Sequence, residues 1–126
     1  MIKILRDSLI KKYFQFSGRA SRKEYWILCL FTFFIMYLLV FLKPYPLVMF
    51  AIFLISCVPY ISLSTRRLHD LNFSGFWELL ILIIVYLILY TKLMFLTDFI
   101  SFFYCIVLGL IKGTPSANKY GDPPTD

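Results

Sequence analysis

The chain has 126 residues, of which 60% are hydrophobic and 20% aromatic, and it carries a formal net charge of +6. Its mean hydropathy is +0.79. A globule of this size leaves a large share of its surface exposed, so it could not hide this much apolar surface from water. We therefore exclude a soluble domain and expect lipid to be part of the solvent.

The basic residues flank apolar runs instead of following a polar groove. This pattern argues against a nucleic-acid partner and indicates contact with the bilayer and its anionic phospholipid head groups.

The N-terminal segment 1–15 predicts a short amphipathic helix lying on the inner membrane surface. Its apolar face is formed by Ile2, Leu5, Leu9 and Tyr13, whereas Lys3, Asp7 and Lys11 lie elsewhere. Ser21 and Glu24 then fit an S-x-x-E capping box directly before the first apolar run, so we expect Ser21 to cap that helix.

Two apolar runs, 25–42 and 47–65, approach the length of about 20 residues that a membrane-crossing helix needs. Pro59 lies inside the second run and predicts either a kink or a close approach by a neighbouring segment. The next apolar stretch, 73–111, would rise about 58 Å as one helix, nearly twice the hydrocarbon thickness. We expect it to fold back at Thr91 and Lys92 into spans 74–90 and 93–111.

The predicted fold is thus an all-α, four-span transmembrane bundle that forms one domain over residues 1–126. Three spans plus a re-entrant segment is the alternative. Counted over the short loops of the four-span arrangement, one side carries eleven basic residues and the other carries Lys43 and Lys92. The positive-inside rule therefore places both termini, the loop 64–77 and the tail 112–126 in the cytoplasm. The eleven are Lys3, Arg6, Lys11, Lys12, Arg19, Arg22, Lys23, Arg66, Arg67, Lys112 and Lys119.

The polar stretch "STRRLHDLNFSGFW", residues 64–77, interrupts the apolar sequence. If the preceding helix continues, Asp70 can meet Arg66 at i,i+4 or Arg67 at i,i+3. One interpretation is a positive stop at the membrane edge, braced by an aspartate. The other is an anion pocket in which arginines grip a phosphate or carboxylate and His69 is a titratable donor. Beyond it, Asn72 tolerates a left-handed conformation and Ser74 can cap the next helix.

Three blocks, "FSGRASRKEYW" (16–26), "RRLHDLNFSGFW" (66–77) and "GTPSANKYGDPP" (113–124), resemble the bacterial inner-membrane family called domain of unknown function 805. The resemblance implies a small bacterial inner-membrane protein and brings no biochemical activity with it. The sequence departs from the family pattern at Asn72, Phe76 and Ser116. The segment between Trp77 and Gly113 also lacks the family's proline or glycine break.

In the four-span arrangement the three blocks lie at the same cytoplasmic end. We hypothesise that they assemble into one basic, aromatic-rimmed binding site; alternatively, they merely tie the ends of the bundle together. The hypothesised ligand-binding residues are Arg19, Arg22, Arg66, Arg67, His69, Asp70, Asn118 and Tyr120. The motif residues with an expected structural role are Gly18, Trp26, Ser74, Gly75, Trp77, Gly113 and Gly121.

The leading functional prediction is a non-enzymatic integral membrane protein that binds anionic head groups or a partner protein. A small oligomeric transporter or channel using Glu78 and Asp98 is one alternative. A membrane enzyme using His69 and Asp70 is the other. Cys29, Cys57 and Cys105 lie in apolar runs without metal-ligand spacing, so we expect packing thiols, no metal and no cofactor. A homo-oligomer remains open.

Overall fold

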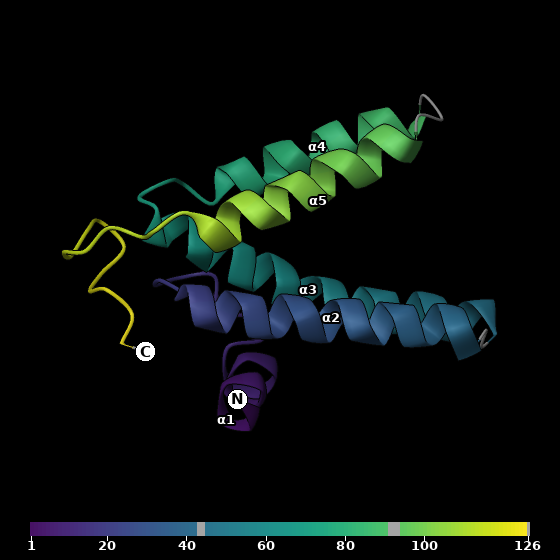
Figure 1. Ribbon diagram of the computed structural model, residues 1–126, viewed down its shortest axis with the longest axis horizontal. Helices are drawn as coiled ribbons and strands as arrows, with labels where there is room; N and C mark the ends of the chain where they lie inside the picture. The colour runs from purple at the N-terminus through teal and green to yellow at the C-terminus, as the bar shows by residue number, and fades with distance from the viewer. Residues whose placement is uncertain (43–44, 91–93, 126) are drawn as a thin grey trace.

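The computed structural model describes residues 1–42, 45–90 and 94–125, and the elements in these ranges are helical (Figure 1). This confirms the all-α prediction. The one β feature among them is an isolated antiparallel bridge between Asn118 and Gly121. The elements are α1 (Ile2–Arg6), the π-helical η1 (Asp7–Lys11), α2 (Arg22–Leu42), α3 (Pro46–Asp70), α4 (Phe76–Tyr90) and α5 (Met94–Leu110).

The four longer helices form two hairpins, α2 with α3 and α4 with α5 (Figure 1). The hairpins converge where α3 ends and diverge toward their other ends, so that the ribbon has the outline of a V. The hydrophobic core lies where they converge. Its buried members are Ala20, Tyr25, Leu28, Cys29, Leu63, Leu68, Cys105 and Leu108.

Helix α2 begins where the capping box predicted. The Ser21 hydroxyl accepts a hydrogen bond of 3.1 Å from the Glu24 backbone N–H, which satisfies one of the free donors of the first turn. In a capping box the Glu24 carboxylate would accept a hydrogen bond from the Ser21 backbone N–H. Here it accepts hydrogen bonds from the side chains of Ser8, Lys12 and Arg66.

Helix α3 runs through Pro59 and continues five residues beyond the predicted end at residue 65. The charged sequence Arg66–Asp70 is therefore its last turn and not a loop. Asn72 follows with a φ of 65°, which confirms the predicted left-handed conformation. The N-terminal segment crosses beside this helix, where the Ser62 hydroxyl lies 3.1 Å from the Lys12 carbonyl and 2.6 Å from the Gln15 carbonyl.

Helices α2 and α3 are both long and apolar enough to cross a membrane. Only 22% of each apolar window is buried, whereas the core helix of a soluble protein would be mostly buried. Helices α4 and α5 are also apolar but shorter, with 15 and 17 residues. They rise about 22 and 25 Å, less than the hydrocarbon thickness of about 30 Å. The predicted turn at Thr91 and Lys92 lies outside the described residues.

Candidate functional site

The three sequence blocks meet where the hairpins converge, as the four-span arrangement predicted. Arg19, from the first block, forms a buried ion pair of 2.7 Å with Asp70 of the second. The same guanidinium donates hydrogen bonds to the third block, at 2.8 Å to the Ser116 carbonyl and 3.3 Å to the Gly121 carbonyl. The Arg19 side chain thus joins a carboxylate about 50 positions away and backbone carbonyls about 100 positions away at one centre.

Arg67 ties the end of α3 to the end of α5. It pairs with Asp70 at the i,i+3 spacing, and its guanidinium also donates to the carbonyl oxygens of Leu108 (2.9 Å) and Ile111. The last carbonyls of a helix lack an intrahelical donor and carry the negative end of its dipole. Arg67 therefore caps the C-terminus of α5 with a cation.

Arg66 joins α3 to α2 and to the N-terminal segment. Its guanidinium lies 2.8 Å from the Glu24 carboxylate, which also accepts hydrogen bonds from Ser8 (3.0 Å) and Lys12 (3.2 Å). Burial acts to raise the pKa of Glu24. The charge and hydrogen bond of Arg66 together with Lys12 outweigh it, so that this pKa lies below its usual range. Glu24 lies directly before the apolar run 25–42 and so belongs to the polar end of α2.

His69 lies beyond the apolar run 47–65 and stacks on the Tyr120 ring, with centroids 3.8 Å apart and planes 6° apart. Its Nδ1 lies 3.1 Å from the Gly18 carbonyl oxygen, which can only accept, so Nδ1 carries a proton. Burial lowers the pKa of His69; the Gly18 hydrogen bond opposes this and the Lys119 charge adds to it. Burial therefore favours the neutral ring, and the Gly18 contact places its N–H on Nδ1.

The tail after α5 is attached to the last turn of α3. The Thr114 N–H donates to the Asp70 carbonyl at 2.9 Å, and the Asn118 amide donates to the His69 carbonyl at 2.9 Å. Asn118 also accepts a bond of 2.9 Å from the Tyr120 N–H, which shapes the turn. A side chain at Gly113 would overlap the Asp70 carboxylate, so only glycine fits there.

Seven of the eight hypothesised binding residues thus come together, and Arg22 is exposed at the edge.

Among the structural motif residues, the Trp26 indole donates a hydrogen bond of 3.1 Å to the Gly109 carbonyl, and a side chain at Gly75 would press on Thr65. Ser74 accepts a long bond of 3.4 Å from the Phe76 N–H, as its predicted capping role requires. Trp77 is half exposed and lies edge-on to Phe73.

Sequence reasoning missed the role of Glu24 as the second acid of this site. A signal was present, because three arginines around one aspartate leave a buried excess of positive charge that needs another anion. We call Arg19, Arg66 and Arg67 with Asp70 and Glu24 the arginine cluster. Each of its guanidinium groups contacts a carboxylate, so the cluster is largely neutralised from within.

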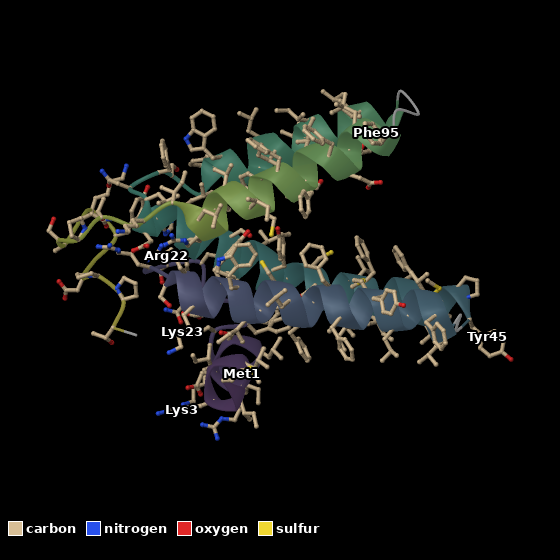
Figure 2. All side chains as sticks on the ribbon, in the orientation of Figure 1. Met1, Lys3, Arg22, Lys23, Tyr45 and Phe95 are labelled. Atoms are coloured by element: carbon tan, nitrogen blue, oxygen red, sulfur yellow. The ribbon has the colours of Figure 1, made fainter. Side chains whose placement is uncertain are left out.

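The basic residues outside the cluster include four exposed side chains, Arg22, Lys23, Lys112 and Lys119, which we call the cationic rim. None of the four forms an ion pair with the described residues. Figure 2 shows nitrogen atoms gathered where the hairpins converge, with Arg22 and Lys23 among them, whereas Tyr45 and Phe95 mark the distant ends. The Lys119 Nζ lies over the Tyr120 ring, 5.0 Å from its centroid.

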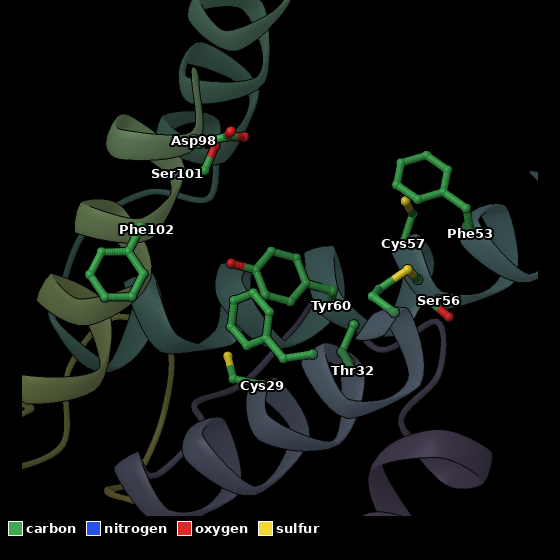
Figure 3. A pocket seen from close by; sticks show the side chains of 11 residues that line it. Cys29, Thr32, Phe53, Ser56, Cys57, Tyr60, Asp98, Ser101 and Phe102 are labelled. Carbon is green, nitrogen blue, oxygen red and sulfur yellow. The ribbon is translucent and has the colours of Figure 1, made fainter. Parts of the chain in front are cut away.

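The two acids of the transporter hypothesis lie near opposite ends of the α4–α5 hairpin. Glu78, in the first turn of α4, is buried and accepts a hydrogen bond from the Tyr104 hydroxyl. Asp98, near the start of α5, lines a cleft of about 400 Å³ between α2, α3 and α5 (Figure 3).

Across residues 1–42, 45–90 and 94–125, no group of three or more His, Cys, Asp or Glu side chains could hold a metal ion.

The fold and site are those of a small helical protein with apolar helices joined at one polar end, and comparison with known sequences defines its class further. Residues 13–122 match the family described as "Protein of unknown function (DUF805)", and the chain belongs to this family. The resemblance found in the three blocks is thereby confirmed.

Two curated relatives from Escherichia coli (strain K12) are similar over nearly their whole length. Inner membrane protein YhaI is 32% identical over 122 residues, covering 93% of this chain and 92% of the relative. Inner membrane protein YhaH is 30% identical over 132 aligned residues, covering 92% of each chain. No solved structure matches significantly.

Proposed function

We propose that this protein is a four-span inner-membrane protein that binds anionic phospholipid head groups at its cytoplasmic end and acts by binding rather than catalysis. The location rests on its relatives, which are named inner membrane proteins. The orientation rests on the eleven basic residues on the predicted cytoplasmic side.

The even number of crossings is supported by the contact between the two ends of the bundle. Arg19, just before α2, bonds to the tail after α5, and this contact supports placing both ends of the helical region on the same side of the membrane. A reporter fusion tests whether the short α4–α5 hairpin crosses the membrane fully. Alkaline phosphatase fused after Lys92 is active if that turn reaches the periplasm and inactive if the hairpin is re-entrant. The same enzyme fused after Thr125 serves as the cytoplasmic control.

The N-terminal segment fits the proposed interfacial helix. Ile2, Ile10 and Phe14 are more than two-thirds exposed, whereas Leu5 and Leu9 pack against the core. A lipid surface would cover the exposed apolar side chains, and Lys3, which is also exposed, would face anionic head groups. In Figure 1 the axis of this segment runs across the directions of α2 and α3, as expected for a helix lying along a membrane surface.

The observation that carries the lipid-binding proposal is the contrast between the buried cluster and the cationic rim. The cluster arginines already hold internal carboxylates, whereas the rim cations are exposed and without ion pairs among the described residues. Each basic residue near an anionic membrane surface contributes about 1 kcal/mol of attraction. The Tyr120 ring beside Lys119 adds an aromatic surface at the same place.

The test compares lipids retained by matched charge variants. Protein in nanodiscs of equal phosphatidylglycerol and phosphatidylethanolamine is analysed by native mass spectrometry. We expect Arg22→Gln/Lys119→Gln to retain fewer phosphatidylglycerol molecules than the wild type. Lys43→Gln/Lys92→Gln, which removes the same charge from the predicted periplasmic side, should retain as many. Equal retention by the two variants would refute a specific rim site.

The other two hypotheses receive less support from the geometry. For the enzyme, Asp70 is held by Arg19 and Arg67, and the His69 Nδ1 proton points to the Gly18 carbonyl. The pair therefore lacks the base–orienter contact that general base catalysis uses. For the transporter, the Glu78 carboxylate accepts a hydrogen bond from Tyr104 of α5, the helix that pairs with α4. The carboxylate is thus used within its own hairpin and does not face the cleft.

A further inference from the structure

Two buried thiols from different hairpins lie side by side. Cys29 of α2 is fully buried, Cys105 of α5 is 3% exposed, and their sulfur atoms are 3.8 Å apart. Both are free thiols in the structure. A disulfide bond is about 2.05 Å long, so an approach of less than about 2 Å would join them. Nothing in the sequence indicates this pair, because 76 positions separate the two cysteines.

Cys29 also lines the cleft between the hairpins, which extends along α2, α3 and α5. In Figure 3, Cys29 and Tyr60 lie close together in one part of the cleft, Phe102 lies across from them on α5, and Cys57 and Phe53 lie farther along α3. The volume of about 400 Å³ is within the range of pockets that bind small organic ligands. Its walls are mainly apolar, and the Tyr60 side chain brings a hydroxyl into them.

The position of the pair restricts the oxidant. Both thiols are buried in the apolar core, so a charged, water-soluble disulfide such as glutathione is excluded from them. An apolar two-electron acceptor dissolved in the bilayer can enter a cleft between the hairpins. Quinones are such acceptors, and a quinone carbonyl can accept a hydrogen bond from a tyrosine hydroxyl.

We propose that Cys29 and Cys105 form a dithiol pair that is oxidised to a disulfide by a quinone bound in the cleft. In this step the two S–H bonds break and one S–S bond forms. The two electrons and two protons pass to the quinone, whose two carbonyl groups become the hydroxyl groups of the quinol. One quinone is consumed per chain, so the site needs no catalytic turnover. The product links α2 covalently to α5.

This inference is independent of the head-group proposal, because it uses residues of the cleft and none of the rim. The experiment uses the full chain in nanodiscs, first reduced, then freed of reductant and treated with decylubiquinone. Samples are denatured and labelled with a maleimide-polyethylene glycol, so that each free thiol adds one mass step. The absorbance of the quinone is followed in parallel.

We expect wild-type protein to fall from three reactive thiols to one, with one quinol formed per chain. Cys57→Ser, which removes the other cleft cysteine, should still lose two thiols. Cys29→Ser and Cys105→Ser should keep their two remaining thiols and form no quinol. Cys57 is the matched control because it also lines the cleft but has no thiol partner among the described residues.

A cleft-filling variant tests where the quinone binds. Ser101→Trp should slow oxidation by decylubiquinone but leave oxidation by diamide, a small membrane-permeant thiol oxidant, unchanged. Three thiols remaining in the wild type after quinone treatment would overturn the proposal, as would disulfide-linked dimers in place of the internal bond. Oxidation by glutathione disulfide as fast as by quinone would exclude a cleft-bound quinone.

Discussion

The Tyr13 hydroxyl donates a hydrogen bond of 2.6 Å to the backbone carbonyl of Ile55. Ile55 lies four residues before Pro59, which has no N–H, so this carbonyl has lost its helical partner. An unsatisfied carbonyl facing lipid costs several kcal/mol. The N-terminal segment thus provides the donor that the proline removes from α3, and it is the close approach that Pro59 predicted.

We expect Tyr13→Phe to destabilise the protein by about 1–3 kcal/mol, because it leaves the Ile55 carbonyl without a donor. The loss should be smaller in a Pro59→Ala background, because alanine restores the N–H that bonds to Ile55. Thermal unfolding in detergent of the four chains of this double-mutant cycle measures the difference. Equal losses in the two backgrounds would show that Tyr13 does not act through this carbonyl.

Asp70 is shared by two buried arginines, so its charge should be essential to the cluster. Asp70→Asn leaves Arg19 and Arg67 without their carboxylate, and breaking a buried ion pair in this way costs about 3–5 kcal/mol. We expect a large drop in melting temperature and in the amount of folded protein. Asp122→Asn, at an exposed position, makes the same chemical change and should alter stability by less than about 0.5 kcal/mol.

Acidification should weaken the arginine cluster through Glu24. Its pKa in the folded protein lies below the unfolded value of 4.5. The ionised carboxylate therefore stabilises the fold above pH 4.5, and this contribution is lost as the pH falls through the folded pKa. We expect the melting temperature to fall more steeply below pH 4.5 for wild type than for Glu24→Gln.

His69 requires a control in this measurement, because its pKa is also lowered, from 6.5. Its neutral ring favours the folded state above pH 6.5, and that contribution is lost as the pH falls below 6.5. A His69→Gln background in both chains removes this effect. Parallel curves for the two chains in that background would contradict the assignment to Glu24.

The Tyr120 ring should hold the tail against α3 through its stack on His69. Tyr120→Ala removes an aromatic contact of about 0.5–1.5 kcal/mol, whereas Tyr120→Phe keeps the ring. We expect trypsin to cleave at Lys119 faster in the alanine variant and at the wild-type rate in the phenylalanine variant. Equal cleavage rates in all three proteins would mean that the stack does not hold the tail.

Much of the architecture follows from short-range patterns. Ser21 and Asn72 act locally, through a cap and a left-handed turn, so their roles are readable from neighbouring residues. The gathering of the three blocks could be predicted from charge asymmetry and helix length. Partner choice within the cluster could not: Arg66 had Asp70 within reach on its own helix but bonds to Glu24 of α2.

Two further features depend on packing between the hairpins and so had no local signal. The Cys29–Cys105 contact depends on how α2 meets α5. The lack of space for a side chain at Gly113, in the tail, is due to the Asp70 carboxylate of α3. The extension of α3 to Asp70 was considered only as a condition for pairing Asp70 with Arg66 or Arg67, and the span was predicted to end at residue 65, because a charged sequence after an apolar run is typical of a loop at the membrane edge.

The attachment of Arg19 to carbonyls of residues 116 and 121 has a consequence for biosynthesis. A ribosome delivers Arg19 to the translocation machinery long before it has made those acceptors. During that interval the guanidinium can pair with Asp70, which is made earlier, but it lacks the carbonyl acceptors of the tail. A chain that lacks its last dozen residues would keep the Arg19–Asp70 pair but lose the hydrogen bonds to residues 116 and 121, so the attachment of the tail is the last part of this site to form.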